Sequence, residues 1–158
     1  MATRVGTAGT YNSGDVIHAA DLNAMPGGTI GRDTLASNST GTTTTETVLS
    51  VAPTVGASRE VTIMVTVNLR ASAATNGQCT IFEDGVQKQR KNAPIPATAT
   101  DVPITTFIVS ENPGAGAHTY SVATGVSGGG GTVTCVNNGG GSNLGASQLL
   151  VVDSGPNF

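Results

Sequence analysis

Charged and aromatic side chains are scarce in this chain of 158 residues. There is no Trp, and Phe and Tyr together make up 3% of the sequence. This counts against a free carbohydrate-binding module, because such modules stack sugars on exposed rings. Charged residues are 11% and the net charge is −3, so the sequence does not indicate a broad basic surface that would bind nucleic acid. The one basic cluster, Lys88, Arg90 and Lys91, fits a solvated outer strand, with a phosphate or glycan contact as the alternative.

Cysteines and long apolar runs are equally sparse. Cys79 and Cys135 lie in separate segments without a CxxC motif, which excludes a zinc knuckle or a thioredoxin-type site. We expect buried free thiols, with a disulfide as the alternative. No run approaches the ~18 apolar residues of a membrane-spanning helix, and the first residues lack the apolar stretch of a secretory signal. We therefore expect neither membrane insertion nor signal-directed secretion.

Catalytic motifs are missing apart from one match that arises easily in a glycine-rich chain. Residues 125–129 read G-x-S-x-G, with Ser127 in the nucleophile position. That motif requires a sharp turn between a strand and a helix, followed later by a histidine. No histidine follows Ser127, and His18 and His118 lack metal-ligand spacing. The sequence therefore predicts no enzyme, and no catalytic, metal or cofactor-binding residues.

The chain is instead rich in Val, Ile and Thr that alternate with a period of two. This pattern is typical of antiparallel strands with one buried face. In segment 61–69 one face carries only apolar side chains: Val61, Ile63, Val65, Val67 and Leu69. The other face carries Thr62, Met64, Thr66, Asn68 and Arg70. We predict a half-buried strand with the first set of side chains in the core.

Turn signals separate the other strand segments, which are residues 29–36, 42–51, 101–110, 118–126, 132–138 and 147–153. Residues 78–91 are expected to form a hairpin, because Asp84 and Gly85 can supply the positive φ angles of a type I′ turn. Pro103 indicates an edge strand or a strand start. About eight or nine short strands without crossover helices predict an all-β fold, an antiparallel jelly-roll sandwich.

The N-terminal segment has a different pattern. Residues 19–25 can form about two helical turns, with His18 at the N-cap position and Asp21 three residues later. Such a short helix is marginal alone, so its apolar side should seek a partner surface. That side consists of Ile17, Leu22 and Met25, and a hinge is expected at Pro26, Gly27 and Gly28. We therefore divide the chain into an N-terminal arm, residues 1–28, and a β-domain, residues 29–158.

The arm resembles the N-terminal segment of many structural proteins of tailed bacteriophages. The shared pattern is an aromatic-x-x-Gly-Asp start followed by Ala-Ala-Asp-Leu-Asn, within "YNSGDVIHAADLNAMPGGTIG". His18 departs from the Thr or Ser that is common in that family and weakens the expected N-cap. The β-domain is similar to jelly-roll modules of the C1q and tumour-necrosis-factor type in "PGAGAHTYSV", residues 113–122, and "LLVVDSGP", residues 149–156.

These resemblances imply a non-enzymatic virion structural protein, a minor tail or fibre-like component. The arm would attach it to the particle through Ile17, Leu22 and Met25, and the β-domain would be displayed. Modules of this type are commonly homotrimers, so the expected partners are copies of the chain, other tail or capsid proteins and a host cell-surface glycan. One alternative is a capsid decoration protein that stabilises the head. Another is a carbohydrate- or receptor-binding module. The expected location is the virion, assembled in the bacterial cytoplasm.

Overall fold

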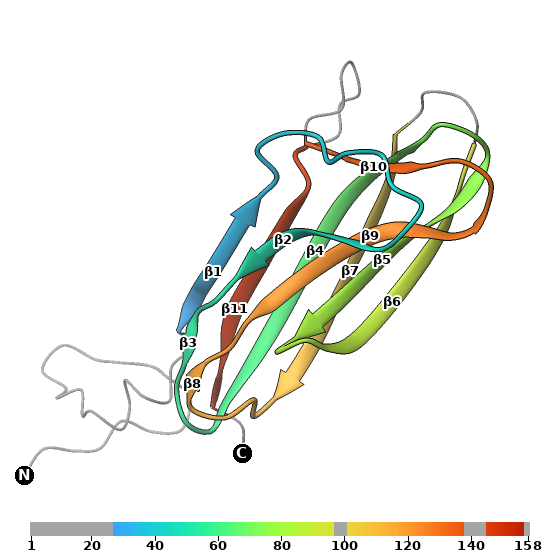
Figure 1. The fold of residues 1–158 in the computed structure, drawn as a ribbon. Helices are drawn as coiled ribbons and strands as arrows, with labels where there is room; N and C mark the ends of the chain where they lie inside the picture. The colour runs from blue at the N-terminus through green and yellow to red at the C-terminus, as the bar shows by residue number, and fades with distance from the viewer. Residues whose placement is uncertain (1–26, 97–100, 138–144, 157–158) are drawn as a thin grey trace, which may run out of the picture.

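The structure, a computed structural model, describes residues 27–96, 101–137 and 145–156. Every regular element in these ranges is a β-strand (Figure 1). The strands are β1 (Gly28–Thr34), β2 (Glu46–Val51), β3 (Thr54–Val55), β4 (Arg59–Ala71), β5 (Thr75–Glu83), β6 (Val86–Ile95), β7 (Val102–Glu111), β8 (Gly116–Ala117), β9 (Tyr120–Gly129), β10 (Val133–Val136) and β11 (Gln148–Pro156). Within the described ranges, no helix is long and apolar enough to span a membrane.

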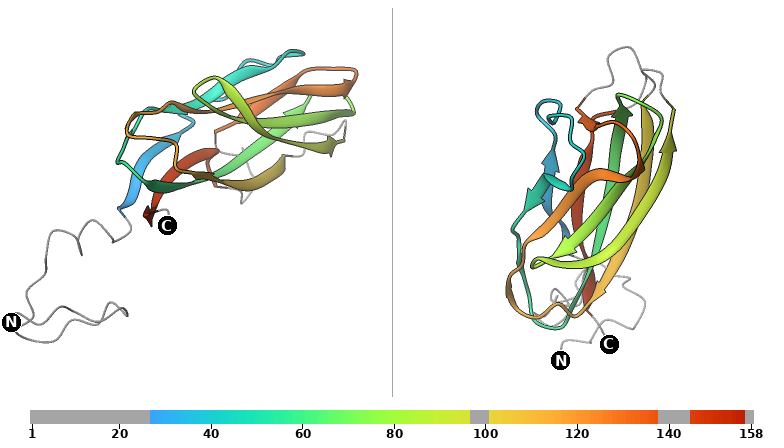
Figure 2. Two further views of the ribbon diagram at one scale, coloured as in Figure 1. Left: turned by 90° about the horizontal axis from the view of Figure 1, so that it is seen from below. Right: turned by 45° about the vertical axis from the view of Figure 1, so that its right-hand side comes forward.

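Eight long strands form two antiparallel sheets that lie as separate layers (Figure 2). Sheet A has the order β1-β11-β4-β7, and β10 continues along β4 beyond the end of β11. Sheet B has the order β2-β9-β5-β6. Counted along the chain without the short β3, β8 and β10, the long strands alternate between the sheets except at the β5–β6 hairpin, as in an eight-stranded jelly roll. The predicted all-β jelly-roll sandwich is thus confirmed, while the predicted helix falls outside the described residues.

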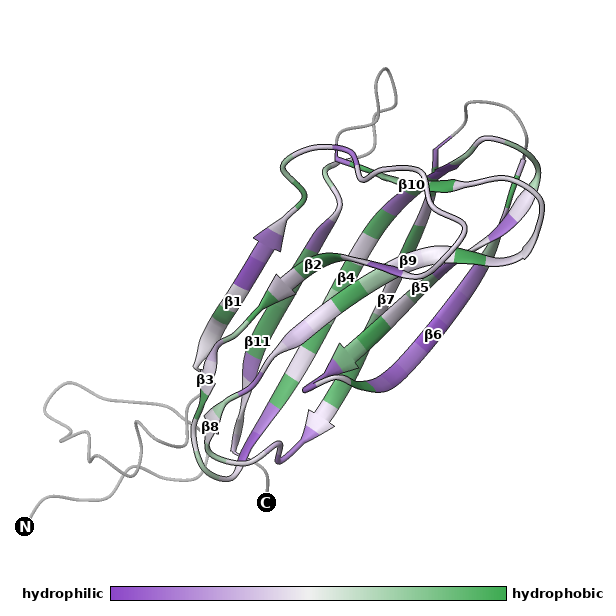
Figure 3. Ribbon diagram, viewed as in Figure 1, coloured by the Kyte–Doolittle hydropathy of each residue, from purple (hydrophilic) through white to green (hydrophobic). Residues whose placement is uncertain are grey.

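The core fills the space between the two sheets, and β4 contributes much of it. All five apolar residues predicted to point inward from segment 61–69 are at most 1% exposed. Leu149 and Val151 of β11 and Ile81 and Val122 of sheet B complete the interior. By contrast, β6 is hydrophilic along much of its length, as expected of an edge strand (Figure 3). The alternation in the sequence therefore assigned the faces of β4 correctly.

The hairpin between β5 and β6 also forms where it was predicted. Asp84 has φ 50° and Gly85 has φ 78°, which are the positive angles of a type I′ turn. Pro103 lies in β7, which among the described strands pairs with β4 alone and is an edge of sheet A. It therefore occupies a position where a missing N–H group is tolerated.

Two details of the prediction are wrong. Strand β2 begins at Glu46, because Thr42 makes only an isolated bridge to Val133 near the end of the sandwich. Asn68, assigned to the solvent face of β4, is 1% exposed. Its Nδ2 donates to the carbonyl of Gly145 at 2.6 Å, and its backbone N–H donates to Ser147 Oγ at 2.9 Å. The chain that leads into β11 therefore covers this polar residue.

The two cysteines are free and buried in opposite sheets, Cys79 in β5 and Cys135 in β10. Burial, with a smaller contribution from neighbouring Cys135, raises the pKa of Cys79 to about 12. Burial raises the pKa of Cys135 to about 11, although a hydrogen bond with Ser147 opposes the rise. Both thiols are therefore protonated and shielded at neutral pH, as the sequence led us to expect.

Candidate functional surfaces of the sandwich

The predicted attachment and hinge residues precede β1 in the sequence, except for Gly28, which is its first residue. Four of them fall outside the described residues: Ile17, Leu22, Met25 and Pro26. Gly28 is the first residue of β1, with φ 70°, and it pairs with Asp153 of β11. Strand β1 therefore begins beside the end of β11. We call this end of the sandwich the arm end, because residues 1–28 join it there.

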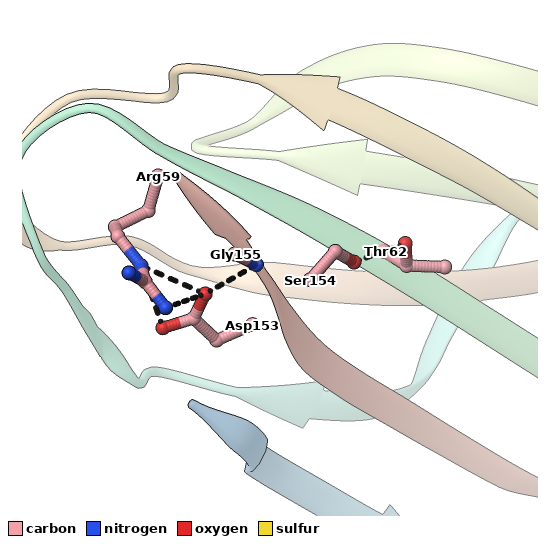
Figure 4. A network of polar contacts seen from close by, with 5 residues as sticks. All are labelled: Arg59, Thr62, Asp153, Ser154 and Gly155. Atoms are coloured by element: carbon pink, nitrogen blue, oxygen red, sulfur yellow. Dashed lines mark hydrogen bonds and ion pairs between the residues drawn. The ribbon is translucent and has the colours of Figure 1, made fainter. Parts of the chain in front are cut away.

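A partly buried ion pair closes the arm end. Arg59, the first residue of β4, and Asp153, near the end of β11, lie 94 positions apart in the sequence (Figure 4). Arg59 Nε donates to both carboxylate oxygens of Asp153 at 2.9 and 3.0 Å, and Nη2 lies 2.8 Å from Oδ1. The backbone N–H of Gly155 donates to the same Oδ1 at 3.0 Å. The two side chains are only 11% and 14% exposed, so this pair fixes the end of β11 on β4.

Gly27 lies directly against this ion pair. A Cβ atom at Gly27 would collide with the carboxylate of Asp153, so a side chain there would have to displace it. A Cβ atom at Gly28 would meet nothing, but its positive φ favours glycine. The two glycines thus let the chain approach the Arg59–Asp153 pair closely as it enters β1. Whether they also form a hinge stays a prediction.

A second polar contact at the arm end involves His118. Its Nδ1 lies 2.7 Å from Asp84 Oδ2, and the backbone N–H of Thr119 donates to Asp84 Oδ1 at 2.7 Å. These two hydrogen bonds lower the pKa of Asp84, the backbone bond having the larger effect. The histidine therefore joins the β5–β6 turn to the start of β9, next to Tyr120, whose ring centroid lies 6.5 Å away.

Glu83 is a buried carboxylate next to that turn, and it is fully engaged. Lys88 Nζ lies 2.7 Å from its Oε2, and Ser110 Oγ donates to its Oε1 at 2.8 Å. Burial alone would raise the pKa of Glu83, but the hydrogen bonds and charge of Lys88 and the bond from Ser110 together lower it. Burial and the nearby Glu83 carboxylate raise the pKa of Tyr120. Because each charge has a partner, this cluster is suited to holding β5, β6 and β7 together rather than to proton transfer.

The remaining residues singled out in the sequence do not form a catalytic arrangement. Ser127 lies inside β9, where its Oγ donates to the carbonyl of Asn76 at 3.1 Å, so the turn that a G-x-S-x-G nucleophile needs is not formed. In the basic cluster on β6, Lys88 is paired with Glu83, and Arg90 donates to Gln87 at 3.0 Å. Across the described ranges, no group of three or more acidic, Cys or His side chains is placed to hold a metal ion.

The outer face of sheet A carries an exposed apolar patch that the sequence analysis did not single out. Met64, Phe107 and Val109 are 39%, 66% and 46% exposed. Leu150 pairs with Met64, and Val152 lies one row along β11, both half-buried. We call these five residues the sheet A patch. Its signal was present in the sequence, because Met64 had been assigned to the outer face of β4 and Phe107 and Val109 occupy alternate positions of β7.

Similarity to known proteins extends only to the fold. The chain matches no protein-family model and no curated protein. A solved structure of infectious bursal disease virus, Gx strain, resembles it with a TM-score of 0.52 and 16% identity. This likeness covers 85% of the present chain but 34% of the viral chain, so the chain spans about a third of that protein. The present chain therefore shares a β-sandwich fold with a viral protein.

Two other solved structures are more distant. The VP2 subviral particle of infectious bursal disease virus has a TM-score of 0.45 and 16% identity, covering 85% of this chain and 39% of that one. A carbohydrate-binding module of lichenase 5A from Cellvibrio mixtus, in complex with cellotriose, has a TM-score of 0.39 and 14% identity. It covers 84% of this chain and 92% of that one.

Proposed function

We propose that this protein is a non-enzymatic structural component of a tailed-phage virion, in the first instance a minor tail or fibre-like protein. In this proposal residues 1–28 attach it to the particle and the jelly-roll sandwich is displayed. The sequence resemblance of the arm to phage structural proteins supports the choice of virus. The shared fold with a viral protein is consistent with it.

The observation that carries the proposal is that the arm joins one end of the sandwich, whereas a group of strand connections lies at the other end. The arm end holds the start of β1, the end of β11 and the charged pairs described above. At the opposite end, residues 35–45, 72–74 and 130–132 connect strands and contain no charged residue, and the charges beside them, Arg70 near the end of β4 and Asp101 just before β7, form an ion pair of 2.7 Å. Ser72 N–H donates to Thr132 O at 3.0 Å, which places two of these connections together. A protein attached by its arm would thus present loops with few charged residues, together with the Arg70–Asp101 pair, away from the particle.

Two alternatives share the same attachment but differ in location or ligand. A capsid decoration protein that stabilises the head would use the arm in the same way on a different surface. A receptor- or glycan-binding module is favoured by one feature, a groove of ≈ 570 Å³ between β6 and β7 whose lining includes Phe107, Lys88 and Glu111. An exposed ring beside charged side chains can bind a sugar. Retention on a glycan array that is lost in Phe107→Ala would support this second function.

We further propose that the displayed form is a homotrimer. The resemblance to C1q- and tumour-necrosis-factor-type modules supports this assembly, and a surface with few charges limits repulsion between copies. Native mass spectrometry of the full-length protein and symmetry in the particle would measure it. A stable monomer in both settings would refute the trimer without affecting attachment by the arm.

The attachment itself is tested with matched variants of the full-length protein. Leu22→Asp places a charge on the expected apolar side of the arm, whereas Asn23→Asp places the same charge one residue away. We expect both to yield folded β-domains by circular dichroism, and only Leu22→Asp to be absent from purified particles by mass spectrometry. A shortened protein that begins at Gly27 keeps β1 complete and should also fail to incorporate. Normal incorporation of both would show that the β-domain holds the attachment surface.

A further inference from the structure

The sheet A patch surrounds a hollow that is large enough to hold one side chain of a protein segment. The hollow has a volume of ≈ 250 Å³ and is lined by Met64, Phe107 and Leu150, with Thr66, Thr105 and Gln148 around them. Sites for drug-sized ligands usually range from about 300 to 1,000 Å³, so this one is small for an organic ligand. An aliphatic side chain from a protein segment fits it better, because the lining is mainly apolar.

The charge around the hollow is also distinctive. The strand registers place three rows of four residues on this part of the outer face, running from β1 through β11 and β4 to β7. Across these rows Arg32 is the single charged residue, next to Leu150 in the row that contains Met64 and Phe107. An occupant of this surface should therefore be apolar and carry one negative charge.

Residues 17–25 of the arm meet that description. They contain Ile17, Leu22 and Met25, and Asp21 is their only carboxylate. If His18 caps a helix, Ile17 and Leu22 occupy the two positions of a hydrophobic staple, and Met25 follows three residues later in the chain. Such a segment presents Leu22 between two other apolar side chains. Asp21 at the neighbouring position could then approach Arg32.

The geometry of the chain allows these residues to reach the patch of their own molecule. Gly28 begins β1, which is the edge strand of sheet A, and the next residue, Thr29, pairs with Val152 of the patch. Adjacent strands are ~4.8 Å apart, so β7 lies roughly 14 Å from β1. Six Cα–Cα steps lead from Leu22 to Gly28 and span up to about 20 Å when extended, or about 15 Å when residues 22–25 are helical. The row of the hollow begins at Arg32, roughly 13 Å along β1 from Gly28, and its centre at β4 lies about 10 Å across the sheet, so Leu22 must cover roughly 16 Å. The extended span covers this distance, and the docked arm is therefore extended between Leu22 and Gly28.

We propose that, in the free protein, residues 17–25 fold back onto the outer face of sheet A of the same chain, with Leu22 in the hollow and Asp21 beside Arg32. This inference rests on the proposed function, which identifies the arm as the attachment segment. The sheet A patch then shields the apolar side of the arm until a particle surface replaces it. Without such an intramolecular partner, both the patch and the arm would favour aggregation.

Disulfide trapping in the full-length protein tests this arrangement. The first variant combines Leu22→Cys with Thr105→Cys, an exposed position on the rim of the hollow. The control combines Leu22→Cys with Ala57→Cys, an exposed position two residues before Arg59 at the arm end. An arm that moves freely should reach position 57 at least as readily as position 105. The native cysteines do not compete, because they are buried and their pKa values are raised.

We expect an intramolecular disulfide to form about tenfold or more faster in the Thr105→Cys variant than in the control, because docking raises the effective concentration of the two thiols. Adding Arg32→Glu should slow this reaction, while Asp21→Arg with Arg32→Glu should restore it. Equal rates in the two cysteine pairs would overturn the inference. So would a disulfide that forms only between two chains, which would indicate an exchanged arm or a face-to-face dimer.

The outcome is separable from that of the proposed function, because trapping is measured in the absence of particles. Failure of trapping together with loss of Leu22→Asp from virions would refute docking on sheet A and leave attachment by the arm intact. Successful trapping together with normal incorporation of Leu22→Asp would support docking on sheet A and refute attachment by the arm. A bound glycan that covers Phe107 in the wild-type protein without displacing the arm would also contradict the docked position.

Discussion

The Arg59–Asp153 ion pair offers the sharpest test of how the arm end is held together. Asp153→Ala would leave the Arg59 guanidinium, only 11% exposed, without the carboxylate that contacts it through two nitrogen atoms. It would also remove the acceptor of the Gly155 N–H group. Removing one partner of a buried ion pair typically costs about 3–5 kcal/mol. Since both side chains retain some exposure, we expect a loss at the lower end, about 3 kcal/mol.

The complementary change, Arg59→Met, keeps the length of the aliphatic side chain but removes the guanidinium that pairs with the Asp153 carboxylate. We expect a similar loss of about 3 kcal/mol, because the carboxylate of Asp153 loses the guanidinium that pairs with it. The double variant Arg59→Met with Asp153→Leu removes both charges and fills the space with apolar atoms. Its loss should be at least about 2 kcal/mol smaller than the sum of the single losses, which is within the range of coupling between contacting residues.

The measurement is equilibrium urea unfolding of the four proteins at neutral pH, followed by far-UV circular dichroism because the chain has no Trp. Comparable slopes of the unfolding free energy against urea concentration are required before the losses are compared. Additive losses would refute the reasoning. They would show that solvent screens the two charges and that the contact does not hold β11 on β4.

Other predictions follow from the core and from the polar groups. Val65→Asp should unfold the sandwich by burying an unpaired carboxylate, whereas Thr66→Asp on the outer face should lower the thermal midpoint only modestly; equal effects would contradict the assigned faces. The two buried thiols should stay unreactive toward a thiol reagent at pH 8 and react after unfolding. The pKa of Glu83 is lowered on folding, so its contribution to stability is present above the unfolded value, about 4.3, and is lost as the pH falls through the folded value. Lys88→Met removes the main partner that lowers this pKa, so acid unfolding should begin at a higher pH than in the wild type.

Local features of the fold were predictable because they depend on neighbouring residues. The alternation in β4 reflects which side of a single strand faces apolar atoms, and burial of Val65 follows from it directly. The turn at Asp84 and Gly85 depends on backbone angles that few other residue pairs adopt. In both cases the physical cause lies within a few positions of the chain, so a single sequence contains it.

The features that escaped prediction depend on residues that are far apart in the sequence. Nothing near Arg59 indicates that its partner is Asp153, because the contact exists only once β11 lies beside β4. The alternation in β4 placed Asn68 on the surface. It is buried because the chain near Ser147, far away in the sequence, covers its side chain. The sheet A patch was hidden for the same reason, since its members come from three strands. The expected attachment residues of the arm lie outside the described residues and stay predictions.

The position of β11 has a consequence for how the protein is made. This strand lies between β1 and β4 in sheet A, although it leaves the ribosome after all the other strands of the sandwich. Until residues 148–156 have been synthesised, β1 has no neighbour in its sheet and β4 lacks one side along much of its length. A nascent chain would therefore expose unpaired edges and apolar side chains throughout translation. We expect the sandwich to close only after residues 148–156 have left the ribosome, and premature termination before residue 148 to produce material that aggregates rather than a smaller folded domain.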